Sequence, residues 1–233
     1  MTTPRDLARR IVKRLGPHPS AALGIDLSED EALGPWLVAS CLLAGRAREA
    51  TACEGYRALA RARLASPAEI AKADPQALHR TLAGAAYPRP ELAALKLARA
   101  AAELEARYGG SLAALASDAE CFEDLASRIA QLAPGIGAAT VARFLRPLRE
   151  RWPAAREVPL APAARAAALH LGLLREGEDE EGEPGVLRSA LLQWADAPAL
   201  ADVEAALTRL GERACLRGRS ARCPLGADCP ARP

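Results

Sequence analysis

Apolar residues recur every three or four positions along most of the chain, which is the period of an amphipathic helix. The clearest stretches are residues 33–43, 91–108, 122–132, 141–152 and 200–210. Strand signals are absent, because β-branched and aromatic residues are few and nowhere alternate with polar ones over six positions. The pattern therefore predicts an all-α protein whose helices are joined mostly by short connections.

Capping residues mark where several of these helices should begin. The predicted starts are Ser28, Ser66, Asp74 and Ser117. Ser28 precedes Glu31 with the spacing of a capping box, while Ser66 and Asp74 are each followed by Pro at the first helical position. Two stretches read as connections instead: residues 153–162 contain three prolines, and residues 176–185 contain six acidic residues. We expect the first to link two lobes and the second to be a solvated loop.

The amino-acid composition excludes some classes of protein. The chain has 233 residues, of which 50% are hydrophobic and 26% are charged, with a formal net charge of +2. These values exclude global disorder, and the net charge is too small to indicate nucleic-acid binding by itself. A charged amino terminus and the lack of a long apolar run predict a cytoplasmic protein with no membrane span. Lysine occurs only at positions 13, 72 and 96, so 28 of the 31 basic residues are arginine, which suits phosphate contact.

One short segment is a candidate anion-binding site. Between two predicted helices the chain reads Leu-Ala-Pro-Gly-Ile-Gly-Ala-Ala-Thr over residues 132–140. Gly135 and Gly137 would let the backbone approach another surface closely, and Ile136 would plug into the helix pair. The following helix, which begins near Ala138 and contains Thr140, would offer free amides and its positive dipole end to an anion such as a DNA phosphate.

Several segments in the same order resemble one family. The hairpin is similar to the family's Leu-Pro-Gly-Val-Gly-x-Lys-Thr-Ala. The other matching segments are Leu42–Glu49, Gly84–Tyr87 with the helix at 91–108, Val158–Ala164 running to Leu173, and the cysteines near the carboxyl end. Together they resemble the endonuclease III superfamily of helix-hairpin-helix DNA glycosylases over about residues 30–230.

The resemblance implies a fold of two all-α lobes. A six-helix barrel would span residues 28–148 and contain most of the helix-hairpin-helix, at about 119–151. The second lobe would combine residues 1–27 with 149–233 and carry a terminal cysteine loop at 215–229. A member of this family would bind double-stranded DNA through its phosphate backbone, and we expect a monomer. The sequence does not identify a protein partner.

The catalytic positions of the family carry other residues here. Where the family's lyases have the Schiff-base Lys, this chain has Ala139, and where the catalytic Asp belongs it has Ala161. Arg46 matches the Gln that fills the gap left by an extruded base. Glu157 is the nearest acidic residue before Ala161 and a weak candidate for a displaced carboxylate; a solvated surface Glu is the alternative. We therefore predict no residue of standard glycosylase or lyase catalysis.

The cysteine loop is incomplete relative to the family. Cys215, Cys223 and Cys229 are present, but Ser220 stands where a fourth ligand belongs. An iron–sulfur cluster completed by Ser220 or an outside donor, a zinc ion with three thiolates, and a loop without metal all stay open. The scattered Cys41, Cys53 and Cys121 fall on helical stripes and are expected to be buried.

The sequence leaves three functional hypotheses open. The first is a DNA-binding protein, related to DNA repair, that lacks the family's standard catalysis. Its nonspecific electrostatic attraction would come from two groups of arginines. These are Arg143, Arg146, Arg149 and Arg151 after the hairpin, and Arg213, Arg217, Arg219 and Arg222 around the cysteines. The alternatives are an active glycosylase with displaced catalytic groups and a helical scaffold that binds a protein.

Overall fold

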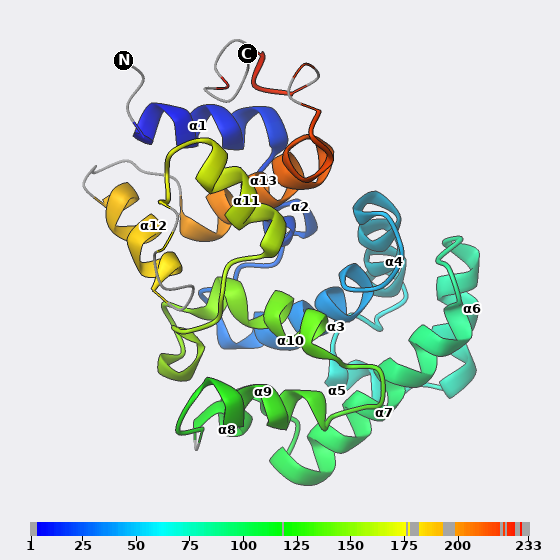
Figure 1. Ribbon diagram of the computed structural model, residues 1–233. Helices are drawn as coiled ribbons and strands as arrows, with labels where there is room; N and C mark the ends of the chain where they lie inside the picture. The colour runs from blue at the N-terminus through cyan, green and yellow to red at the C-terminus, as the bar shows by residue number, and fades with distance from the viewer. Residues whose placement is uncertain are drawn as a thin grey trace. The chain divides into compact units, whose positions relative to one another are not determined.

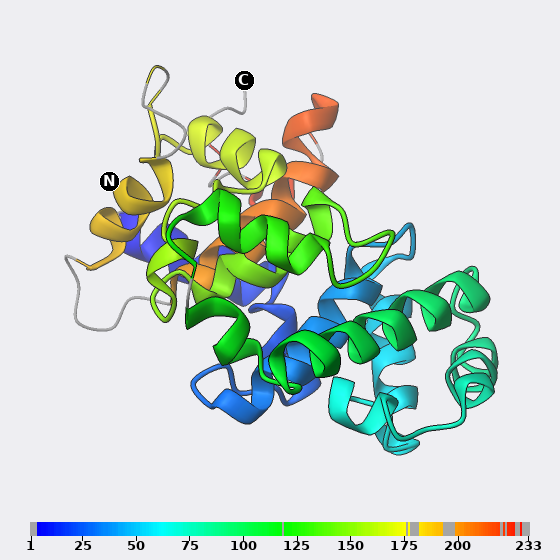
Figure 2. The ribbon, with the colours of Figure 1, turned by 90° about the horizontal axis from the view of Figure 1, so that it is seen from below.

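The protein is all-helical (Figures 1 and 2). The computed structural model describes residues 4–117, 119–175, 177, 182–192, 199–219, 221, 223–226 and 229, and no strand occurs among them. The α-helices are α1 (Pro4–Leu15), α2 (Pro19–Leu23), α3 (Leu33–Leu43), α4 (Glu49–Arg61), α5 (Pro67–Ile70), α6 (Pro75–Gly84), α7 (Pro90–Tyr108), α8 (Leu112–Ser117), α9 (Phe122–Ala130), α10 (Ala138–Leu145), α11 (Pro162–His170), α12 (Glu183–Leu192) and α13 (Leu200–Arg213). The 3-10 turns are η1 (Asp30–Ala32), η2 (Arg146–Leu148), η3 (Pro153–Ala155) and η4 (Cys215–Arg217). The all-α prediction is confirmed, and most of the acidic run at 176–185 lies outside the described residues.

The chain divides into two compact units. Unit 1 comprises Met1–Ala22 and Glu157–Pro233, and unit 2 comprises Leu23–Arg156. The sequence-based division placed the limits of the central lobe at 28 and 148, whereas the structure extends that lobe at both ends. The extension is explained by Trp152, which packs edge-on against Phe144 with ring centroids 5.7 Å apart, and by Arg151, whose guanidinium bonds the Leu27 carbonyl at 2.7 Å.

Unit 2 is organised around α3. Almost every side chain of this helix from Trp36 to Leu43 is buried, which is expected of a helix that is apolar all round. Helices α4, α5, α7 and α10 pack against it. The indole Nε1 of Trp36 donates to the Phe144 carbonyl at 3.0 Å, so the polar tip of this buried ring is satisfied by α10. Helix α3 is therefore fixed directly to the helix that follows the hairpin.

Local capping decides where some helices begin, and two of the predicted caps are wrong. Ser66 forms the predicted capping box with Glu69, and the Asp74 side chain accepts from the Gln76 amide. Ser28 instead donates to Asp26 at 2.8 Å, and α3 begins at Leu33 without a side-chain cap. Ser117 ends α8 and donates to the Ala114 carbonyl, while α9 begins after Cys121. In both failures the serine hydroxyl bonds a nearer local group, as short polar side chains commonly do.

Unit 1 is organised around α13, which packs against α1 and α11. The approach to α11 requires glycine at position 211, because a Cβ there would overlap the backbone carbonyl of Ala163. The guanidinium of Arg209 caps α1, with Nη1 within 3.1 Å of the carbonyls of Leu15, Gly16 and Pro17. These contacts join the amino-terminal helix to the carboxyl-terminal half of the chain. Among the described helices, none combines the length and apolar character that a membrane span requires.

Candidate nucleic-acid interface and cysteine loop

A short loop joins α9 to α10 (Figure 1), and its conformation depends on glycine. The Ile136 amide donates to the Ala133 carbonyl at 3.1 Å, and Gly135 between them has a φ of +90°, which favours glycine. The Ile136 side chain is 4% exposed, so it packs into unit 2. Gly137 has extended backbone (φ −98°, ψ −178°), and beyond its own chain neighbours no atom lies within 4 Å of the position that a Cβ would take. The first glycine makes the turn, and the second leaves the backbone open to approach.

The start of α10 presents unused backbone donors. The amides of Thr140 and Val141 both donate to the Gly137 carbonyl, at 2.9 and 3.1 Å. Within the described part of the chain, no hydrogen bond is recorded for the amides of Ala138 and Ala139, and both residues are exposed. The Thr140 side chain is buried, so only its place at the start of the helix connects it to this surface. Two amides and the helix dipole therefore face solvent together.

Lys96 on α7 joins the hairpin to the end of α3. Its Nζ donates to the Cys41 carbonyl at 2.8 Å, and its Cδ lies 3.7 Å from the position that a Cβ would take on Gly135. The half-buried ammonium thus sits beside the hairpin and at the negative end of the α3 dipole. The role of Lys96 was not predicted from the sequence. The rarity of lysine in an arginine-rich chain was the one signal that could have drawn attention to it.

A second side chain caps α3 and fixes the loop that carries Arg46. The Tyr87 hydroxyl donates to the Leu42 carbonyl at 2.8 Å, and a Cβ on Gly45 would lie 2.8 Å from that hydroxyl oxygen. Burial raises the pKa of Tyr87 to about 12, so the phenol stays protonated and able to donate. Arg46 follows α3 by three residues and is exposed, as is Arg48 at the start of α4.

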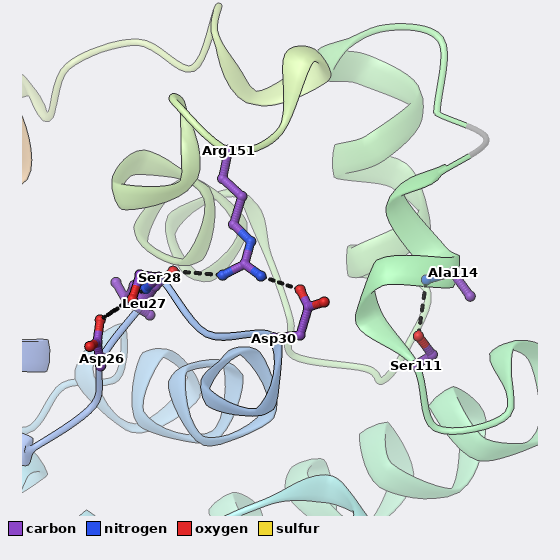
Figure 3. A network of polar contacts seen from close by, with 7 residues as sticks. All are labelled: Asp26, Leu27, Ser28, Asp30, Ser111, Ala114 and Arg151. Atoms are coloured by element: carbon purple, nitrogen blue, oxygen red, sulfur yellow. Dashed lines mark hydrogen bonds and ion pairs between the residues drawn. The ribbon is translucent and has the colours of Figure 1, made fainter.

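The arginines after the hairpin differ in exposure and in bonding partners. Arg143 and Arg146 are partly exposed, but Arg149 is 5% exposed and its Nη1 donates to the Arg146 carbonyl. Arg151 binds the Leu27 carbonyl and the Asp30 carboxylate, next to the turn in which Asp26 bonds Ser28 (Figure 3). Arg149 and Arg151 thus bond within unit 2, and the attraction of this group of arginines for DNA stays a prediction.

The catalytic positions named by the resemblance lie on different units. Ala139 is exposed on α10 in unit 2, and Ala161 is 7% exposed before α11 in unit 1. Glu157 is exposed. Glu204 on α13 was not predicted to lie here; its Oε1 accepts from the Ala161 amide at 3.1 Å, and the residue is 3% exposed. The acidic residue next to Val203, on an otherwise apolar stripe, was the available signal.

The three terminal cysteines come together in unit 1. Cys223 and Cys229 are buried, Cys215 is half-buried, and all three adjoin one apolar cluster. Burial first, and then the neighbouring thiols of Cys223 and Cys229, raise the pKa of Cys215. Among the described residues, no group of three or more Cys, His, Asp or Glu side chains is arranged to hold a metal ion. Three thiols do not fit a cluster that needs four thiolates, and Ser220 and Arg222 lie outside the described residues.

The scattered cysteines behave differently from one another. Cys41 and Cys53 are buried as expected, and burial raises the pKa of Cys41 to about 11, which keeps its thiol protonated. Cys121 is exposed at the start of α9, so the expectation of burial is wrong there.

The hairpin surface can therefore accept an anion through backbone amides with a cation beside them. Ala139, at the position where the resemblance places the lyase's lysine, offers no nucleophile. No protein-family model matches the chain, and no curated protein sequence matches it either.

Proposed function

We propose that the protein binds the backbone of double-stranded DNA through the α9–α10 hairpin, as a divergent relative of the endonuclease III superfamily with a role related to DNA repair. One observation carries the proposal. The exposed amides of Ala138 and Ala139 follow Gly137, whose surroundings leave room for close approach, and the Lys96 side chain lies against Gly135. Backbone amides at a helix start bind phosphate without reading base sequence.

Charge near the hairpin supports the same proposal. Lys96 has two ammonium protons beyond the one that it donates to Cys41, and Arg46 extends from the loop that Tyr87 fixes. Each cation that neutralises a phosphate releases counterions, so binding should weaken as salt rises. Arg149 and Arg151 add little to this electrostatic attraction, because their guanidinium groups bond to backbone carbonyls of the protein itself.

The proposed role does not include standard glycosylase or lyase chemistry. Ala139 and Ala161 offer neither an amine nor a carboxylate. The alternative of an active glycosylase needs another acid, and neither candidate favours it: Glu157 is exposed, whereas Glu204 is buried and bonded to the Ala161 amide. The cytoplasmic location and the monomeric state inferred from the sequence stay predictions.

The test compares two aspartate substitutions in unit 2. Gly137→Asp places a carboxylate among the α10 amides, where it repels phosphate and competes for the same donors. Gly84→Asp is the matched control, because Gly84 also has open space around its Cβ position and an ordinary φ. Binding to a fluorescent duplex is measured by anisotropy from low to moderate salt.

We expect wild-type affinity to fall with salt and Gly137→Asp to bind at least ~10-fold more weakly, equivalent to about 1.4 kcal/mol. Gly84→Asp should bind like the wild type. Because Gly137 is an extended N-cap residue, where Asp is favoured, the test variant should melt no lower than the wild type. Equal binding by a folded Gly137→Asp would remove the hairpin from the interface. A wild-type protein that does not bind duplex at low salt would favour the protein-scaffold alternative.

A further inference from the structure

Two successive turns near the carboxyl end bring Cys223 and Cys229 together. The Gly226 amide donates to the Cys223 carbonyl at 2.9 Å, and the Cys229 amide donates to the Gly226 carbonyl at 3.2 Å. Gly226 has a φ of +58°, so the shared residue of the two turns is one that tolerates this conformation. Both side chains are buried in one apolar cluster. Burial first, and then the neighbouring Cys229 thiol, raise the pKa of Cys223. Five residues separate these cysteines in sequence.

The loop is fixed to the rest of unit 1. Leu225, which lies between the cysteines, is 1% exposed in the same apolar cluster as both of them. The Arg14 guanidinium donates to the carbonyls of Pro224 and Leu225, at 3.0 and 2.9 Å. Helix α1 therefore holds the turn that sets the two thiols side by side.

Cys215 is placed differently from this pair. It lies on η4 and is half-buried, whereas Cys223 and Cys229 are each 8% exposed. Cys215 only packs against the apolar cluster, whereas Cys223 and Cys229 belong to it and lie on the two successive turns. Cys223 and Cys229 are thus a buried pair, and Cys215 lies beside them.

We propose that Cys223 and Cys229 form a reversible intrachain disulfide, which makes this loop a redox-responsive site rather than a four-thiolate metal site. The inference does not depend on the proposed DNA binding, since all the contacts that carry it lie within unit 1.

The oxidant is a low-molecular-weight disulfide. One thiol of the pair, as thiolate, attacks a sulfur of that disulfide, which forms a mixed disulfide and releases one small thiol. The second cysteine then attacks the sulfur of its neighbour, which forms the Cys223–Cys229 bond and releases the second small thiol. Two electrons pass to the small disulfide, and the two protons are taken up by the released thiols. A reducing dithiol reverses the reaction.

The experiment uses the full-length chain with Cys121→Ser, because the exposed Cys121 would itself take up the oxidant. Reduced protein is equilibrated with oxidised glutathione and quenched with an alkylating agent. We expect two thiols to be lost with no glutathione adduct, a fall of about 2 Da in the unalkylated mass, and a crosslinked peptide joining Cys223 to Cys229. Dithiothreitol should restore both thiols.

Two variants identify the pair. Cys215→Ser should leave the crosslink intact, whereas Cys229→Ser should abolish it and leave a glutathione adduct at Cys223. A crosslink through Cys215, adducts without a crosslink, or no loss of thiols at equilibrium would each overturn the proposal. Stoichiometric iron or zinc in the freshly purified protein would overturn it as well, because a bound metal would occupy the same sulfurs.

Discussion

Replacing Lys96 with methionine tests whether one side chain serves both the fold of unit 2 and the proposed interface. Methionine keeps most of the unbranched stem that lies against Gly135 and removes the ammonium. The substitution therefore leaves packing largely unchanged. It deletes the hydrogen bond to the Cys41 carbonyl and the positive charge beside the hairpin.

The two effects have separable magnitudes. A charge-assisted hydrogen bond from a half-buried lysine to a helix-terminal carbonyl contributes about 1–2 kcal/mol, so the melting temperature should fall by about 3–6 °C for a chain of this length. If the ammonium also contacts one phosphate, the slope of log K against log salt should become shallower by about 0.9.

Thermal melting and salt-dependent anisotropy measure these effects in the same preparations. Lys72→Met is the matched control, because Lys72 is exposed on unit 2 and its loss changes the net charge equally. Lys96→Arg should recover the salt slope because it restores a cation. A Lys96→Met protein with the affinity and slope of the Lys72→Met control would refute a role for Lys96 in DNA binding, whatever its melting temperature.

Three other predictions concern unit 1 and catalysis. Glu204→Ala should destabilise the protein by about 2 kcal/mol, because it strips the buried Ala161 amide of its acceptor, whereas Glu204→Gln should cost less; chemical denaturation measures both. Gly211→Ala should cost about 3 kcal/mol by the same measurement, because its Cβ meets the Ala163 backbone. Borohydride should trap no covalent adduct with abasic DNA, since Ala139 supplies no amine; stoichiometric trapping on a mapped lysine would contradict this.

The helices and the hairpin could be predicted because their signals are local. The apolar period of residues 91–108 and the Gly109 stop correspond to α7, which ends with Gly109 in a left-handed conformation. Gly135, Ile136 and Gly137 form the tight turn expected of them, since its geometry depends on residues within one another's reach along the chain. Fold class follows from such patterns without knowledge of distant contacts.

The residues that sequence reasoning missed have distant partners. Lys96 binds a carbonyl 55 positions earlier, and Glu204 binds an amide 43 positions earlier. The contacts of Arg151 could not be predicted for the same reason, because Leu27 and Asp30 are more than a hundred positions away. Nothing in the residues around an arginine distinguishes one that faces solvent from one that closes a fold, so its role depends on tertiary structure.

The bonds that the cationic side chains of unit 2 make to the protein's own backbone affect how the protein could hold DNA. Arg149 and Arg151 stabilise the segment after α10, and Lys96 and Tyr87 cap α3, so most of the polar contacts near the hairpin position backbone. A surface of this kind has few side chains to contribute and relies on main-chain donors whose places are fixed by packing. Such donors cannot be removed by truncating a side chain, which is why an added carboxylate at Gly137 is a sharper probe than arginine-to-alanine substitution. It also means that affinity should depend on the stability of unit 2, because the amides of Ala138 and Ala139 are aligned only while α10 is held against α3 through Trp36.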